Sequence, residues 1–353
     1  MFVLMNELIG ASKRGSIGCL LQSCFSVGIA FFSLMAYYIT FWRRLTLAIS
    51  LFGLPIFIMA CFILPESPRW LLNMGRVKES IAVLKLIASG NKTKFDHKLI
   101  DEDDSEDSED EITIQPHIPP SQRSANEPPD SWFDLFTDKF LLKMTLIQIF
   151  CWFVNGMAYY GLTLAAGETS KDSLYWGTAI SGLVELPAYF GSIFTLKYFN
   201  RTTNILSVMI FAGIAMLSIP LLQSWSPSMA ATLGFLGKLG ISASFAFIYI
   251  HSSEFFPTSI RNASMGLVSV AARVGGMVAP FMANLGQTVA NLHFIVFGIL
   301  SLISGLTYFV LPDTKDQPLP ENLKELKSRR IHVVSVQSPQ TTYKKVPLSD
   351  HEL

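Results

Sequence analysis

The stretch HSSEFFPTSIRNASMGLVSVAARVGGMVAP, residues 251–280, joins two long apolar runs through a short charged turn. The first run ends near Ile250, the turn holds Glu254 and Arg261, and the second run carries Arg273 near its middle. If both runs cross a membrane, Arg273 lies deep in the hydrocarbon layer, where a cation is costly unless it faces protein or water. The pattern predicts membrane-spanning helices and makes Arg273 the first candidate for a functional residue.

The composition of the whole chain also indicates a membrane protein. Half of its 353 residues are hydrophobic and only 15% are charged, whereas soluble domains carry about 25% charged residues. The formal net charge is zero, which predicts no nucleic-acid partner. The four cysteines lie in apolar runs without CxxC spacing, so we expect neither disulfides nor a metal site, and no cofactor.

Apolar windows long enough to span a bilayer recur along the chain. Crossing about 30 Å of hydrocarbon takes about 20 residues of helix. Within the windows, the formally charged residues are Glu185, Lys238 and Arg273. The eight windows are residues 15–39, 45–64, 144–166, 174–196, 203–223, 228–250, 263–285 and 287–311.

The spacing of these windows divides the chain into four segments. Residues 1–64 hold two spans, preceded by an apolar stretch too short to cross, which we interpret as the last turns of a further span. Residues 65–143 are expected to form a cytoplasmic loop, residues 144–311 a group of six spans, and residues 312–353 a flexible polar tail. The predicted fold is an all-α membrane bundle of about eight full spans and a remnant of a ninth.

Two stretches of the loop are predicted to form helices on the membrane surface. GRVKESIAVLKLIASG, residues 75–90, places apolar residues at helical spacing. SWFDLFTDKFLLK, residues 131–143, follows Asp130 and begins with Ser131, either of which could cap a helix. Both stretches therefore belong to the interface between membrane and water.

The middle of the loop has a different character. DEDDSEDSEDE, residues 101–111, contains nine acidic residues, and a stretch rich in proline follows it. Such a composition buries too little apolar surface to offset the chain entropy, so residues 91–130 are predicted to be disordered. The acidic run is interpreted as a solvated segment, with phosphorylation of Ser105 or Ser108 as the alternative.

Basic residues predict the orientation of the chain in the membrane. Positive residues concentrate on the cytoplasmic side of membrane proteins. Both termini, the acidic loop and the Glu254–Arg261 turn are therefore expected in the cytoplasm, and glycosylation motifs at Asn91, Asn200 and Asn262 are expected to stay unmodified. The predicted cytoplasmic set is Lys13, Arg14, Arg69, Arg76, Lys78, Lys139, Lys143, Lys197, Arg201 and Arg261, against Arg43, Arg44 and Lys171 outside.

The three charged residues within the windows could form one layer of a substrate site. Glu185, Lys238 and Arg273 each lie 10 or 11 residues into their window, a depth of about 15–17 Å. One carboxylate with two cations leaves an excess of positive charge, which suits an organic anion or the carboxylate of a zwitterion. The alternative is a structural ion pair of Glu185 with Lys238 or Arg273. Arg273 is the preferred ligand residue, because a guanidinium binds a carboxylate through two hydrogen bonds.

Tyr159 and Tyr160 are the aromatic candidates for the same site. Their rings could hold an ammonium group by cation–π attraction, worth about 2 kcal/mol when desolvated. Alternatively they are interface tyrosines near the end of a span. Since both readings fit the sequence, the tyrosines stand as candidates for substrate binding.

Several strings resemble one transporter family. NELIGASKRG (6–15) and WRRL (42–45) come first, followed by PESPRWLL (65–72), YYGL (159–162), SGLVELPAY (181–189), LGKLG (236–240), EFFPTSIRN (254–262) and ARVGG (272–276). In this order they resemble the organic cation, anion and zwitterion transporters of the major facilitator superfamily. The resemblance begins at the end of that family's fourth span.

The resemblance implies a fold and a mechanism. It implies an incomplete major facilitator bundle and a secondary transporter that works by alternating access. It also implies that Glu254 and Arg261 belong to a cytoplasmic gate, together with the motif residues Pro65, Glu66, Ser67, Pro68 and Arg69.

By the same resemblance, the charge at the Arg273 position follows the substrate class. It is acidic in typical cation carriers and basic in the anion and carnitine carriers. Since this chain has arginine there, the resemblance is to the carnitine-like zwitterion branch, in which a carboxylate meets Arg273 and an ammonium meets aromatic rings such as Tyr160. The predicted partners are a small organic ion, the lipid bilayer of the plasma membrane and a coupling ion, with sodium and proton both left open.

Other classes of protein fit the sequence less well. The chain has no GxxxxGK[ST] loop, no HExxH string and no Ser/His/Asp arrangement, so we predict that it is not an enzyme or an ATP-driven pump. An organic anion transporter is the nearest alternative within the resemblance. The alternative from another class is a truncated membrane protein that does not transport.

Overall fold

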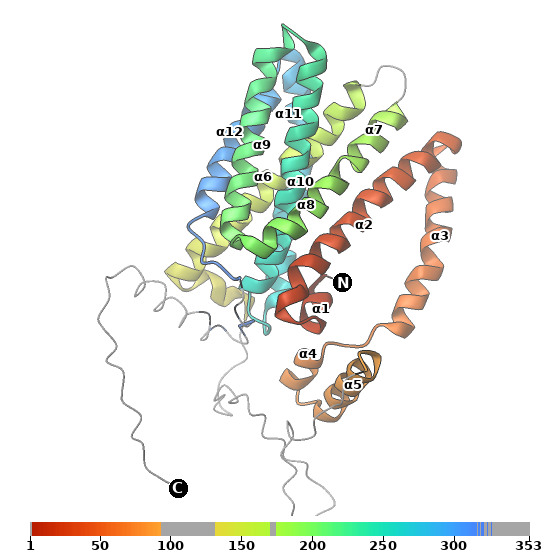
Figure 1. The fold of residues 1–353 in the computed structure, drawn as a ribbon, viewed down its shortest axis with the longest axis vertical. Helices are drawn as coiled ribbons and strands as arrows, with labels where there is room; N and C mark the ends of the chain where they lie inside the picture. The colour runs from red at the N-terminus through yellow and green to blue at the C-terminus, as the bar shows by residue number, and fades with distance from the viewer. Residues whose placement is uncertain are drawn as a thin grey trace, which may run out of the picture.

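The computed structural model describes residues 2–92, 131–169 and 174–315, together with residues 317, 319, 320, 323 and 326. Helices make up the regular structure of these residues, and Figure 1 shows most of the long ones gathered into a bundle, with the shorter α4 and α5 below α3. The acidic segment at 101–111, which we predicted to be disordered, lies outside the described residues, as does the distal part of the tail.

The described helices follow the apolar windows closely. In chain order they are α1 (Phe2–Leu8), α2 (Ala11–Tyr38), α3 (Trp42–Ile63), α4 (Pro68–Asn73), α5 (Val77–Gly90), the 3-10 helix η2 (Trp132–Phe136), α6 (Lys139–Thr169), α7 (Leu174–Leu183), α8 (Glu185–Tyr198), α9 (Arg201–Gln223), α10 (Pro227–Phe255), α11 (Arg261–Thr288) and α12 (Leu292–Tyr308).

The number of long spans differs by one from the prediction. Among the described residues, seven helical stretches are long and apolar enough to cross a membrane. The eighth window, 287–311, contains only the 17 residues of α12, which rise about 25 Å. The helix is shorter than predicted because Asn291 adopts a left-handed conformation with φ of 63° and separates α12 from α11.

The window 174–196 is interrupted beside its charged residue. A turn at Val184 separates α7 from α8, so Glu185 is the first residue of α8. Pro187 explains the interruption, because it has no N–H to donate to the carbonyl of Leu183 one turn earlier. The interruption places the Glu185 carboxylate at a bend in the span.

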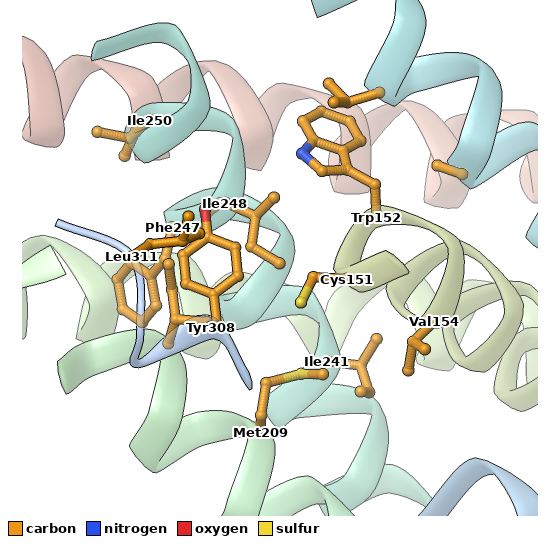
Figure 2. Packing of buried hydrophobic residues seen from close by; sticks show 14 of the residues in the cluster. Cys151, Trp152, Val154, Met209, Ile241, Phe247, Ile248, Ile250, Tyr308 and Leu311 are labelled. Carbon is orange, nitrogen blue, oxygen red and sulfur yellow. The ribbon is translucent and has the colours of Figure 1, made fainter. Parts of the chain in front are cut away.

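The bundle has a compact part and a loosely attached part. Helices α6 and α8 to α12 pack around one apolar core, and α2 leans against α7 and α8. Figure 2 shows part of this core, to which α9 contributes Met209, α10 contributes Ile241 and Phe247, and α12 contributes Tyr308. In contrast, α3 buries none of its residues and packs mainly against α2.

The surface segments of the loop are partly as predicted. α5 forms over Val77–Gly90, within the predicted amphipathic stretch. The second stretch forms only the short 3-10 helix η2, capped by Ser131, because Asp138 bonds to the N–H of Phe140 and starts α6 at Lys139. The prediction of a separate surface helix up to residue 143 is therefore wrong.

The PESPRWLL segment before α4 contains an exposed ion pair. Glu66 pairs with Arg76 at 3.4 Å. Arg76 also bonds Glu79, and this hydrogen bond holds the pKa of the Glu79 carboxyl below its usual range. Arg69 lies within electrostatic range of arginines on other helices.

The proximal tail is packed, which contradicts the prediction of a flexible segment for these residues. Leu319, Leu323 and Leu326 are buried, and the N–H of Thr258 donates to the carbonyl of Pro320 at 2.9 Å. These leucines cover apolar surface at the end of the bundle where α10 turns into α11, so burial of that surface holds the tail in place.

Candidate functional site

A buried ion pair lies at the centre of the compact part of the bundle. Lys238 Nζ on α10 is 3.1 Å from Glu185 Oε1 on α8, and their side chains are 2% and 0% exposed. Lys238 Nζ also donates to the hydroxyl of Thr163 and lies 3.7 Å from the centre of the Tyr159 ring. The ammonium is therefore surrounded by a carboxylate, a hydroxyl and an aromatic face.

The carboxylate of Glu185 is equally well bonded. Tyr159 Oη donates to Oε1 at 2.7 Å, while Tyr189 Oη and Ser26 Oγ donate to Oε2 at 3.1 and 2.8 Å. A buried charge is tolerated when it is paired and when its remaining lone pairs accept hydrogen bonds. The alternative of a structural ion pair is thus realised for Glu185 with Lys238.

Some members of this cluster were not singled out as site residues from the sequence. Tyr189 lies four residues after Glu185 on the same helix, and this spacing is a usable signal. Ser26 and Thr163 come from α2 and α6, and their distance along the chain from Glu185 hides the contact. Only the packing of these helices brings their hydroxyls to the pair.

Arg273 lies in a different environment from the other two charged residues. It is exposed, and its Nη1 donates to Tyr160 Oη at 3.0 Å. Among the described residues it makes no ion pair. The predicted layer of three charges therefore separates into a closed pair, Glu185 with Lys238, and a cation with free hydrogen-bond donors.

Close packing of α6 against α11 holds Arg273 beside Tyr160. A Cβ added to Gly275 would lie 2.2 Å from the carbonyl oxygen of Phe153, and one added to Gly156 would lie 2.1 Å from that of Ala272. Only glycine permits the two backbones to approach so closely. The close contacts at Gly156 and Gly275 thus set the position of the guanidinium.

Aromatic rings connect the exposed arginine to the buried pair. Tyr160 meets Tyr159 edge to face at 5.4 Å between ring centres, and Tyr159 meets Phe245 at 5.4 Å. Phe245 and Tyr249 continue the group toward Trp152, whose ring centre is 4.4 Å from that of Tyr249. Tyr159 is buried inside the bundle, so the interpretation as an interface tyrosine is wrong for this residue.

A second cluster of charges closes the end of the bundle at the Glu254–Arg261 turn. Arg201 Nε lies 3.3 Å from Glu254 Oε2, and Thr314 Oγ1 donates to the same carboxylate at 2.7 Å. Arg261 Nη1 lies 2.8 Å from Glu7 Oε1, which joins α11 to α1. The four charged side chains are buried or nearly so.

The spacing of acidic and basic residues in the sequence is a signal for this cluster. Glu7 precedes Arg14 by seven residues, just as Glu254 precedes Arg261. The two arginines also bond alike, since each Nε donates to the carbonyl five residues earlier, at 3.2 Å in Arg14 and 3.0 Å in Arg261. The equal spacing and bonding indicate an internal repeat, as transporters built from two similar halves show.

The predicted gate motif lies beside this cluster. Ser67 Oγ accepts from the N–H of Trp70 and caps α4, while the carbonyl of Pro68 accepts from Ser80 Oγ and joins α4 to α5. Arg69 lies within electrostatic range of Arg14 and Arg261. Pro65 and Glu66 complete the turn from α3 into α4.

His251 ties the end of α12 to the same region. Its Nδ1 lies 2.8 Å from Tyr308 Oη and its Nε2 lies 2.9 Å from the carbonyl oxygen of Pro312. The next residue, Asp313, accepts from the N–H of Arg201 at the start of α9. The chain after α12 is thus joined to both α9 and α10 at the charged end.

Together, the long apolar helices, the ion pair at the centre of the bundle and the charge cluster at one end describe a membrane protein of the major facilitator fold. Residues 3–325 match the family described as "Sugar (and other) transporter", and the chain belongs to that family. The match places it among transporters and not among enzymes.

Curated relatives narrow the family further. Solute carrier family 22 member 15 of Xenopus tropicalis is 37% identical over 92% of this chain and 59% of its own length. An organic cation transporter protein of Drosophila melanogaster is 36% identical over 92% of this chain and 58% of its own. The predicted resemblance is confirmed, and the chain spans somewhat under three fifths of the length of these relatives.

Solved structures share the fold at lower identity. The proton:xylose symporter XylE bound to 6-bromo-6-deoxy-D-glucose matches with a TM-score of 0.67 and 20% identity, over 93% of this chain and 70% of that one. An inward-open structure of the xylose transporter XylE from E. coli matches with a TM-score of 0.54 and 18% identity, over 93% and 68%. This likeness confirms the predicted all-α bundle.

Proposed function

We propose that this chain forms part of a plasma-membrane carrier for small organic ions that bear a carboxylate, and that zwitterions such as carnitine are its substrates. The observation that supports the proposal is Arg273, an exposed cation without a carboxylate partner among the described residues. A guanidinium binds a carboxylate with two parallel hydrogen bonds. The donors that Tyr160 does not use are available for it.

The charge of the site favours a carboxylate over a simple cation. Lys238 neutralises Glu185 inside the protein, so the pair contributes no net charge to the open surface. Arg273 leaves that surface with one positive charge, which would repel a cation that lacks an acidic group. We therefore assign Arg273 and Tyr160 to substrate contact, and Glu185, Lys238 and Tyr159 to the support behind them.

Aromatic rings supply a place for the ammonium group of a zwitterion. Tyr160, Phe245 and Tyr249 are half-buried and line up beside Arg273. Cation–π attraction to such faces contributes about 2 kcal/mol when the cation is desolvated. An organic anion without an ammonium would gain only the contact with Arg273, and it is the second candidate on that ground.

The charge cluster at the end of the bundle supports alternating access. The Glu7–Arg261 pair links α1 to α11, and the Arg201–Glu254 pair links α9 to α10. We propose that these pairs close the cytoplasmic side, where the basic residues of the chain also place both termini. Opening would then require the Glu7–Arg261 contact between the two halves to break.

The proposal is tested by uptake and binding of labelled carnitine. Cells expressing the 353-residue chain, and the same chain purified into lipid nanodiscs, are compared with an Arg273→Ala variant and with a Lys85→Ala variant, which changes a basic residue on α5. We expect uptake and binding in the parent and in Lys85→Ala, and a loss of at least tenfold in Arg273→Ala at unchanged surface level.

Two outcomes would reject the proposal. Equal uptake by Arg273→Ala and the parent would remove Arg273 from the site. Absence of both uptake and binding in the parent would favour the alternative of a membrane protein that does not transport. A variant Tyr160→Ala separates the two substrate classes, because it should weaken the binding of carnitine more than the binding of a simple carboxylate of similar size.

A further inference from the structure

A cavity of about 200 Å³ lies between α6, α9, α10 and α12, away from Arg273. Pro227 and Gln223 stand at its mouth, at the end of the bundle opposite Glu254, and Lys238 forms its floor. Lys238 lies 11 residues after Pro227 on α10, which corresponds to a depth of about 16 Å. The cavity therefore reaches from the helix ends to the buried ion pair by a route separate from the proposed substrate surface.

The wall of the cavity between mouth and floor is apolar. Leu162, Ile219, Phe235 and Phe294 contribute the larger side chains, and Gly234 leaves room beside them. Apolar cavity walls favour small apolar molecules, and an enclosed engineered cavity of about 150 Å³ binds benzene. A volume of about 200 Å³ admits a single aromatic ring with one small substituent.

The floor determines the charge of the occupant. The Lys238 ammonium is already paired with Glu185, bonded to Thr163 and seated on the ring of Tyr159. A carboxylate entering the cavity would give this buried cluster a net negative charge, and an unpaired charge in an apolar interior is strongly unfavourable. An ammonium would meet Lys238 directly and be repelled. An uncharged molecule meets neither penalty.

We propose that this cavity is a binding site for a small uncharged aromatic molecule, of the size of phenol, that rests on Lys238 behind the transport site. The proposal does not depend on which substrate is carried. It gives the chain a second ligand site, whose occupant touches the same lysine that holds Glu185 and Tyr159 in place.

The site can be probed by protection of an introduced cysteine. Gly234 lines the cavity, and a Cβ built there meets no atom within 4 Å, so Gly234→Cys fits without strain. Gly191 on α8 is equally open but exposed and outside the cavity, so Gly191→Cys is the matched control. Both are made in a background with Cys24→Ser and Cys61→Ser, because those two cysteines are exposed.

The measurement is the rate of modification by methyl methanethiosulfonate, followed by intact mass, in nanodiscs at pH 7. Phenol is uncharged and benzoate is ionised at this pH. We expect saturating phenol to slow modification of Gly234→Cys at least fivefold, with no change at Gly191→Cys, and benzoate to protect neither. Ala231→Cys, on the same wall, should behave like Gly234→Cys.

The proposal is overturned by any of three results. Equal slowing of Gly234→Cys and Gly191→Cys would show partition of phenol into lipid, not binding. No slowing at either Gly234→Cys or Ala231→Cys would show that the cavity takes no such ligand. Protection by benzoate as strong as that by phenol would reject the requirement for an uncharged occupant.

Discussion

Lys238 and Arg273 look alike in the sequence and have opposite surroundings in the structure. Each is a lone basic residue near the middle of an apolar span. Lys238 is enclosed by Glu185, Thr163 and Tyr159, whereas Arg273 is exposed and bonds only to the hydroxyl of Tyr160 among the contacts of the described residues. The difference separates a cation that is paired inside the protein from one that has no carboxylate partner among the described residues.

This contrast teaches how a membrane protein can keep charge in its interior. A buried charge is stable only with a partner, so Lys238 and Glu185 depend on each other. An unpaired charge at the same depth has to face water, a cavity or a ligand. Exposure and pairing, not charge alone, are therefore the basis on which we propose a structural role for Lys238 and a ligand-binding role for Arg273.

The largest effect is expected from breaking the buried pair. Lys238→Met leaves the Glu185 carboxylate buried without its partner, and removing one member of such a pair costs about 3–5 kcal/mol of folding free energy. The measurement is the unfolding midpoint in lipid nanodiscs. The double variant Lys238→Met with Glu185→Gln should recover part of the loss, and a loss as large as the sum of both single variants would contradict the assignment of a coupled pair.

A smaller effect is expected from the helix contact that positions Arg273. Gly275→Ala places a Cβ 2.2 Å from the carbonyl oxygen of Phe153, and overpacking of this kind costs about 1–3 kcal/mol. Gly266→Ala in the same helix meets no atom within 4 Å and should be neutral or slightly stabilising. Equal thermal stability of the two variants would show that the close approach of α6 and α11 is not required.

The two neighbouring tyrosines sharpen the comparison further. Tyr159→Phe removes a hydrogen bond to a buried carboxylate, which is worth about 1.5–3 kcal/mol. Tyr160→Phe removes one to the exposed Arg273, so it should cost less than about 1 kcal/mol. The check is the difference in free energy of unfolding between the two variants, and a larger loss for Tyr160→Phe would reverse the assigned roles.

The smallest effect on stability is expected at Arg273 itself. Arg273→Gln removes an exposed charge without an ion pair, and such surface changes usually stay within about 0.5 kcal/mol. Uptake and binding of carnitine should nevertheless be lost. If the unfolding midpoint instead falls as far as in Lys238→Met, then Arg273 is a structural residue and the comparison with Lys238 fails.

The sequence predicted the spans well and their details less well. Apolar windows are long and carry few charges, so helix existence follows directly from composition. Three details depend on single residues: the bend beside Glu185 on Pro187, the short α12 on Asn291, and the early start of α6 on Asp138. The mean hydropathy of a window does not reveal such local effects. The proximal tail packs on apolar surface from elements distant in the chain, and the pattern of apolar residues in the tail itself does not predict that contact.

What the sequence determined by itself is the membrane class, the approximate spans and the set of charged residues that had to be explained. Its motifs also indicated the transporter family. Only the tertiary structure decided which of these charges are neutralised. That decision depends on Ser26, Thr163 and Tyr189, and on glycines that let α6 and α11 touch. These contacts join residues far apart in the chain. Their energies depend on distances between helices, and the spacing of residues along one helix does not give those distances.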